Sequence, residues 1–282
     1  MNKFSTLFLS LFSVCLCVIS CGGNTEQRPK FVKSPVDNLI TKYIDVNNYT
    51  VILADMDYKE DIDKYYHKYR ILLQKSKPNL TREQLQDTTA QATDIKVETT
   101  DWLEVSPIIF EDHQNDLGMT ILNKENGVLD KNSAPAGANG YVGNPQYGQW
   151  QTHSNGSSFW AFYGRYRLMS DLFFGPRYGY GGYYGYPRND WNDYRRNYRG
   201  RTDYYGRNNQ YGSRSKTTNT NTSWNKKPSS FKSKVQSKVR QSSSSLKSRG
   251  YTSSKSYSKT TRNTNRFSTS STSRGRSGGF GK

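Results

Sequence analysis

Cysteine and acidic residues are each missing from a large part of this 282-residue chain. The three cysteines are Cys15, Cys17 and Cys21, and none follows Cys21. A disulfide framework and a cysteine zinc site are therefore excluded beyond that point. No acidic residue follows Asp203, so every charge in the remainder of the chain is positive.

Charge is divided unevenly between the two halves of the sequence. Residues 1–150 hold 15 Lys and Arg against 19 Asp and Glu, a net charge of −4. Residues 151–282 hold 26 against 4, a net charge of +22, and the two halves sum to +18. This asymmetry predicts a mildly acidic body and a basic tail that binds polyanions.

The N-terminus combines a positive residue, Lys3, with an apolar run from Phe4 to Ile19. That run is short for a membrane span and typical of a signal peptide. Val18-Ile19-Ser20-Cys21 follows, and this motif resembles the lipobox of bacterial lipoproteins. The resemblance implies cleavage between Ser20 and Cys21 and attachment of diacylglycerol to the Cys21 thiol. Val18 departs from the commoner leucine, and an ordinary secretory signal or a membrane anchor is the alternative.

The residues after Cys21 bear on which membrane would hold the protein. Aspartate directly after the cysteine is frequent in lipoproteins retained at the inner membrane, whereas this chain has Gly22. Surface export in some bacteria uses an acidic cluster there, and only Glu26 is present. We therefore expect a lipid-anchored envelope protein at the periplasmic face of the outer membrane.

The fold class expected from the sequence is a small α+β domain, followed by an aromatic helix and a long disordered basic tail. A signal peptide takes residues 1–20 and a lipidated tether residues 21–35. The α+β domain spans residues 36–130. Within it, apolar and alternating patterns predict strands at 49–54, 65–73, 95–105 and 119–122, and capping-box spacing predicts a helix over 82–92.

The second half of the chain is richer in glycine, aromatic and hydroxyl residues. Residues 131–156 are predicted to be a Gly/Asn-rich loop, and residues 157–174 an aromatic amphipathic helix that packs on the body or lies in a membrane interface. Residues 175–212 are Tyr/Gly/Arg-rich and of low complexity. In residues 213–282 aliphatic side chains nearly vanish, so this segment is predicted to be disordered.

No arrangement of residues indicates catalysis, a cofactor or a metal, and we expect that the protein is not an enzyme. Acidic residues cluster between Asp55 and Asp63, but Glu60 stands where a calcium loop needs glycine. The histidines lack ligand spacing, and Glu111-Asp112-His113 is expected in a polar loop. The histidines are His67, His113 and His153.

Arginine and lysine of the second half are the candidate binding residues, because guanidinium and ammonium groups attract anionic polymers. Phe231, Val235 and Val239 share one face at helical spacing, so a basic amphipathic helix is expected to form there on an anionic surface. The candidate polyanion-binding residues are Arg195, Arg196, Arg199, Arg201, Lys232, Lys234, Lys238 and Arg240.

The function expected from these features is that of a structural or adaptor lipoprotein. Its basic tail would bind an anionic envelope polymer, such as lipopolysaccharide or peptidoglycan, or an anionic surface. One alternative makes the α+β domain a ligand- or protein-binding module with the tail as a spacer. Nucleic-acid binding is a further alternative, which export makes less favourable.

The lipobox resemblance gives the first testable prediction. Cells that express the chain should incorporate a fatty-acid label into it, because the Cys21 thiol is the acceptor. Cys21→Ser should abolish labelling, while Cys17→Ser should leave it intact. Labelling is measured in the membrane fraction of the bacterial cells. Equal labelling of the wild-type and Cys21→Ser chains would contradict the prediction.

Overall fold

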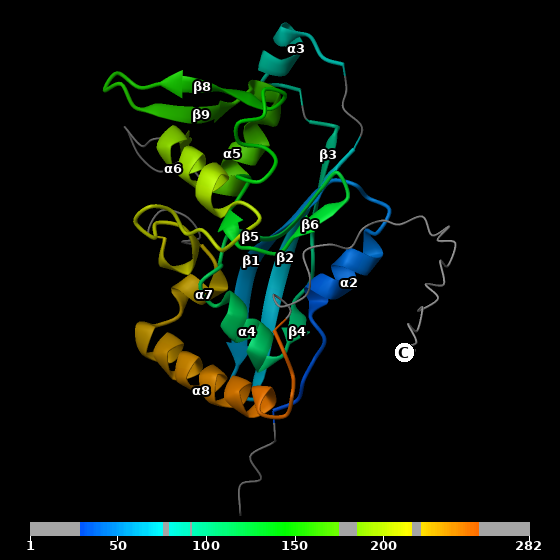
Figure 1. The fold of residues 1–282 in the computed structure, drawn as a ribbon, viewed down its shortest axis with the longest axis vertical. Coiled ribbons are helices and arrows are strands. Elements are labelled where there is room, and N and C mark those ends of the chain that lie inside the picture. Colours follow the sequence, from blue (N-terminus) through cyan, green and yellow to red (C-terminus); the bar gives the residue numbers. More distant parts are fainter. Residues whose placement is uncertain (1–28, 76–78, 91, 175–184, 216–220, 254–282) are drawn as a thin grey trace, which may run out of the picture. The chain divides into compact units, whose positions relative to one another are not determined.

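The computed structural model describes residues 29–75, 79–90, 92–174, 185–215 and 221–253. Those from Phe31 onward belong to one compact unit that combines helices with two antiparallel sheets (Figure 1). The α+β class is therefore confirmed. A separate domain that ends at residue 130 is not observed, because later segments complete its core. Among the described helices none is long and apolar enough to cross a membrane.

The larger sheet is built around the hairpin of β1 (Tyr49–Lys59) and β2 (Lys64–Gln74). Its strand order is β3-β2-β1-β5-β6, with β4 beside β2 and β7 beside β5. The other strands are β3 (Ile95–Thr99), β4 (Leu103–Val105), β5 (Met119–Glu125), β6 (Val128–Asp130) and β7 (Ala134–Pro135).

Alternation along the strands assigns side chains to the two faces of this sheet. Val51 and Leu53 contribute to one hydrophobic cluster, which also includes residues of helices α2 (Pro35–Lys42) and α4 (Pro107–His113). Ile52 contributes to a second cluster, together with residues of α5 (Arg167–Phe174). On β2, Tyr65, Tyr69 and Ile71 join the first cluster and Leu72 the second, so the period of two read from its sequence is confirmed.

The predicted helix over 157–174 is wrong in its first part. Ser158–Phe162 forms strand β9, which pairs with β8 (Gly148–Thr152) and β10 (Tyr186–Pro187) in a smaller sheet. A one-turn helix at Gly164–Tyr166 and then α5 follow. A run dense in aromatic residues fits both the helical period of 3.6 and the strand period of two, and pairing with β8 stabilises the strand. The aromatic side chains pack in the core, which is the interpretation favoured from the sequence over the membrane interface.

Two further segments also differ from the sequence-based expectation. Residues 131–156 contain β7 and β8 and bury Tyr141 and Tyr147, so they are not simply a loop. The helix expected over 82–92 is shorter: α3 covers Arg82–Gln86 behind the expected capping box. The described residues 185–212 are folded too, with α6 (Arg188–Asp193) continuing into the π-helical turn η2 (Tyr194–Tyr198) and then, at Gly212–Arg214, the 3₁₀ turn η3.

The largest correction concerns the basic segment from residue 221 to residue 253, which we call the C-terminal strap. Disorder is predicted there, but the strap contains α7 (Ser223–Lys226) and α8 (Ser229–Lys247). Helix α8 packs against α4 (Figure 1). Trp224, Val235 and Val239 belong to the cluster on the sheet. The expected amphipathic helix therefore exists, and its apolar face covers the protein's own core.

The acidic residues of the β1–β2 hairpin receive the strap. Asp55 accepts hydrogen bonds from the backbone N–H groups of Ser223, at 2.7 Å, and of Trp224, at 3.2 Å. Lysines of the strap form ion pairs with carboxylates of the hairpin and of α4. The pairs are Lys227–Asp57 at 3.2 Å, Lys234–Glu60, Lys238–Asp63 at 3.0 Å and Lys247–Glu111 at 2.8 Å.

Apolar burial, rather than these ion pairs, holds the strap. Exposed ion pairs contribute about 0.2–1 kcal/mol each, and the lysines involved are a third to two-thirds exposed. Full burial of one large apolar side chain contributes about 1.5–3 kcal/mol, and the strap buries Trp224, Val235, Val239 and Leu246. Charge pairing then selects the position of α8 along the hairpin.

Truncation of Trp224 tests this packing. Its ring lies 5.5 Å from that of Phe110 and is 3% exposed, so Trp224→Ala should lower the free energy of unfolding by about 3–5 kcal/mol. Trp102→Ala is the matched control, because Trp102 is 38% exposed and should cost much less. Guanidinium unfolding measures both variants. Similar small losses for the two would show that the strap does not complete the core.

Candidate functional site

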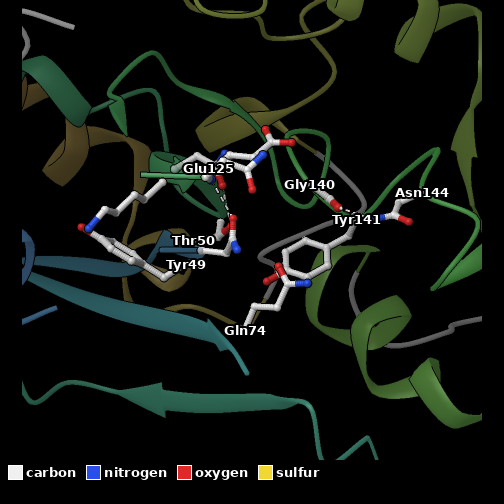
Figure 2. Close-up of a pocket in the computed structure, with 11 residues that line it drawn as sticks. Tyr49, Thr50, Gln74, Glu125, Gly140, Tyr141 and Asn144 are labelled. Atoms are coloured by element: carbon white, nitrogen blue, oxygen red, sulfur yellow. Dashed lines mark hydrogen bonds between the residues drawn. The ribbon is translucent and has the colours of Figure 1, made fainter. Parts of the chain in front are cut away.

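An open pocket with mainly polar lining lies at the end of the β1–β2–β5 region of the larger sheet (Figure 2). Its interior volume is about 120 Å³, and about 510 Å³ when the open space at its mouth is counted. Five of its eleven lining residues carry side-chain amides, so we call it the amide pocket. The lining residues are Asn48, Tyr49, Thr50, Gln74, Asn123, Lys124, Glu125, Asn126, Gly140, Tyr141 and Asn144.

Hydrogen bonds hold the polar wall of this pocket in place. The Thr50 hydroxyl donates to the Asn123 side-chain oxygen at 2.8 Å, across the β1–β5 pair. The Asn48 side chain accepts from the backbone N–H of Asn126 at 2.8 Å. On the opposite side, the Asn144 amide donates to the Gly140 carbonyl at 3.4 Å. Figure 2 shows the Gln74 side chain extending toward the Tyr141 ring, and the Gln74 amide donates to the Tyr147 hydroxyl at 2.5 Å.

Both charged residues of the amide pocket are bound to other groups. The Lys124 ammonium donates to the Ile44 carbonyl at 2.6 Å, and the Glu125 carboxylate pairs with Arg199. Arg199 also donates to the Asn139 carbonyl at 3.1 Å. The Lys124 ammonium carries a positive charge, but the side chain is buried and its hydrogen bond is directed to Ile44. The pocket therefore offers mainly amide donors and acceptors, which suit hydroxyl or amide groups of a ligand.

The structure divides the predicted polyanion-binding residues into two groups. Arg199, Lys234 and Lys238 are paired with carboxylates of the body. The Tyr58 hydroxyl and then the Asp63 carboxylate hold the pKa of Lys238 above its ordinary value, so its charge is retained. Arg195, Arg196, Arg201 and Lys232 form no ion pair among the described residues, and all but the half-buried Lys232 are exposed. Arg240 is exposed as well, and against the effect of burial its charge helps, after Lys247 and Ser243, to lower the pKa of Glu111.

The sequence expectation for Glu111-Asp112-His113 is wrong, because these residues belong to α4 rather than to a polar loop. His113 is buried and its Nδ1 lies 2.8 Å from the Asp116 carboxylate. Asp116 also accepts from the hydroxyls of Ser133 and Tyr205, both at 2.6 Å. This group is enclosed in the core, where it joins α4 to later segments.

The other two histidines, His67 and His153, contact aromatic side chains. His67 is fully buried, with Nδ1 3.0 Å from the Tyr69 hydroxyl, and His153 stacks on Phe159 at 3.9 Å. No group of three or more metal-ligating side chains is found among the described residues. Asp55, Asp57, Glu60 and Asp63 of the acidic cluster serve the strap, as described above.

The amide pocket was missed in the sequence, and little signal for it exists there. Its residues come from β1, β2, β5 and the loop after β7, which are up to about a hundred positions apart. Asparagine-rich turns normally indicate a loop alone. A second, smaller pocket of about 270 Å³ is lined mainly by apolar residues, including Phe173, Phe174 and Tyr186.

Comparison with known proteins finds no matching family model, curated protein or solved structure.

Burial of His67 generates a prediction about pH. Burial and then His113 hold the pKa of His67 well below its ordinary value near 6.5. Below about pH 6.5, His67 therefore binds a proton in the unfolded chain but stays neutral in the folded protein. Stability from this group is complete above that pH and falls below it, by up to about 1.4 kcal/mol per pH unit.

His67→Gln removes this proton uptake, so its free energy of unfolding should fall less between about pH 8 and about pH 5 than that of the wild type. Guanidinium unfolding at both pH values measures the difference in slope, whatever the variant's baseline stability. Parallel declines would show that His67 is not held neutral by the fold.

Proposed function

We propose that this protein is a lipid-anchored binding protein of the bacterial cell envelope, without enzymatic activity, whose folded unit binds a polyhydroxylated ligand such as a saccharide in the amide pocket. Cys21 carries the lipid, and the outer membrane, facing the periplasm, is the proposed location. Of the functions expected from the sequence, this is the ligand-binding module rather than the tail-borne adaptor.

The composition of the amide pocket is the observation that supports this function. Each amide side chain both donates and accepts, as each sugar hydroxyl does, so amide-lined walls match a hydroxylated ligand group by group. Tyr141 also lines the pocket, but its ring is buried against Tyr147 and Phe173, so the amide side chains carry the argument. With Lys124 and Glu125 occupied by other partners, the pocket has no free charge that would demand an ionic ligand.

Binding of an anionic envelope polymer is the second candidate. Its support is the set of predicted arginines that form no ion pair among the described residues, namely Arg195, Arg196 and Arg201. The remainder of the basic arm expected from the sequence, residues 254–282, lies outside the described residues.

Gly140 allows the amide pocket to be closed without disturbing the fold. A Cβ placed there meets no atom within 4 Å, so a side chain has open space. Gly140→Phe should therefore fold normally, fill the pocket and lower affinity for a neutral N-acetylglucosamine tetrasaccharide by at least about tenfold, because displaced hydrogen bonds contribute about 0.5–1.5 kcal/mol each.

Gly140→Ala is the matched control, because one methyl group should leave both folding and binding close to the wild type. Titration calorimetry measures affinity, and circular dichroism confirms the fold of each variant. Two results would refute the proposal: wild-type protein that binds no neutral oligosaccharide, or Gly140→Phe protein that binds as tightly as the wild type.

A further inference from the structure

Two tryptophans lie side by side at the smaller sheet, and an arginine packs on each of them. Arg188 and Trp191 of α6 and Arg195 of η2 are three and four residues apart, so they share one helix face. The Arg188 guanidinium lies 5.2 Å from the Trp150 ring, and that of Arg195 lies 4.8 Å from the Trp191 ring. The two indoles are 5.3 Å apart. We call these four residues the Trp–Arg ladder.

The backbone around residue 143 fixes the ladder from behind. Gly143 has φ of +79°, and a Cβ there would lie 2.2 Å from the Trp191 ring, so only glycine permits this contact. On the strand side, Trp150 packs against the buried Trp160, with ring centroids 5.2 Å apart. Both indoles are therefore held before any ligand arrives.

The two guanidinium groups of the ladder are exposed and carry no ion pair among the described residues. Carboxylates are available on the same helix, at Asp190 and Asp193, but these accept hydrogen bonds from tyrosine hydroxyls and side-chain amides instead. The strap lysines differ, because carboxylates of the body already occupy them.

A guanidinium that stacks on an indole keeps the N–H groups at its edge free for carboxylate or phosphate oxygens. Stacking also restricts the side chain, so less conformational entropy is lost when an anion binds. Two such groups on one helix face would hold two successive acid groups of a polymer.

The ladder and the amide pocket are connected by one short loop. Gly140, Tyr141 and Asn144 line the pocket, and Gly143, between them, contacts Trp191 of the ladder. A chain of sugars that occupies the pocket thus has an arginine-bearing surface next to the same loop.

We propose that the Trp–Arg ladder is an anion-binding site and that the ligand of this protein is an acidic saccharide, bound by its sugar hydroxyls in the amide pocket and by its carboxylate or phosphate groups at Arg188 and Arg195. The saccharide part rests on the function proposed above, whereas the anion site rests on the ladder alone.

A matched pair of ligands tests the proposal on the full-length protein. One is an oligogalacturonate, which carries a carboxylate on each sugar, and the other is its methyl ester, which has the same sugars without charge. A phosphate-bearing glycan tests the other acid group, and duplex DNA tests nucleic acid. Affinity is measured across a salt series, since exposed charges are screened by salt.

We expect the acidic form to bind at least about tenfold more tightly than its ester, as one or two hydrogen bonds to charged groups would produce. Arg188→Gln combined with Arg195→Gln should reduce the acidic form to the affinity of the ester and remove most of its salt dependence. Arg188→Lys with Arg195→Lys should give an intermediate loss, because charge remains while the planar stack is lost. The control pair, Lys30→Gln with Lys33→Gln, removes the same charge from exposed residues outside both sites and should have little effect.

Equal loss in the ladder variant and the Lys30/Lys33 control would overturn the anion site, since net charge alone would then explain binding. Preference for DNA at matched charge would also overturn it, in favour of nucleic acid. If the protein does not bind the ester but binds the acidic form through the ladder arginines, the saccharide site in the amide pocket is refuted and the anion site stands. Unchanged binding of both forms by the ladder variant would refute the ladder and leave the pocket.

Discussion

Insertion of Trp224 beside Phe110 is the contact on which the rest of the structure depends. It anchors the strap on the β1–β2 hairpin, after which Val235 and Val239 close the same cluster. Without the strap, that face of the sheet would expose aromatic and aliphatic side chains to water. The acidic hairpin gives the strap its position, because Asp55 caps α7 and the outer carboxylates meet successive lysines of α8.

This docking changes how the high positive charge of the chain is to be understood. A net charge of +18 suggests a surface ready for polyanions, yet several of the lysines and Arg199 are occupied by the acidic body. Among the predicted polyanion-binding residues, Arg195, Arg196, Arg201 and the half-buried Lys232 form no ion pair in the described part of the chain, and Arg195, like Arg188, stacks on a tryptophan. The proposed binding chemistry follows from which cations the fold leaves unpaired, together with the amide pocket next to the same loop.

The sequence predicted well those elements whose burial is local and periodic. Strand β2 alternates along its length, and the capping box at Thr81 marks the start of α3. It failed where the decisive partner is distant. Residues 229–247 contain few apolar side chains, and only the complementary hairpin, more than 150 positions earlier, allows them to form a buried helix. Likewise, Tyr186 and Tyr194 come from a low-complexity stretch but are core residues, because they pack with Trp160 of the smaller sheet.

Amide hydrogen exchange across α8 tests the central claim most directly. If the strap is part of the core, amides of residues 235–246 should exchange as slowly as those in the centre of β1 and β2, because they open only when the whole unit unfolds. Exchange at the rate of an unstructured chain, alongside a protected sheet, would show that the strap is detached in solution. The docked arrangement, and the account of charge that depends on it, would then be wrong.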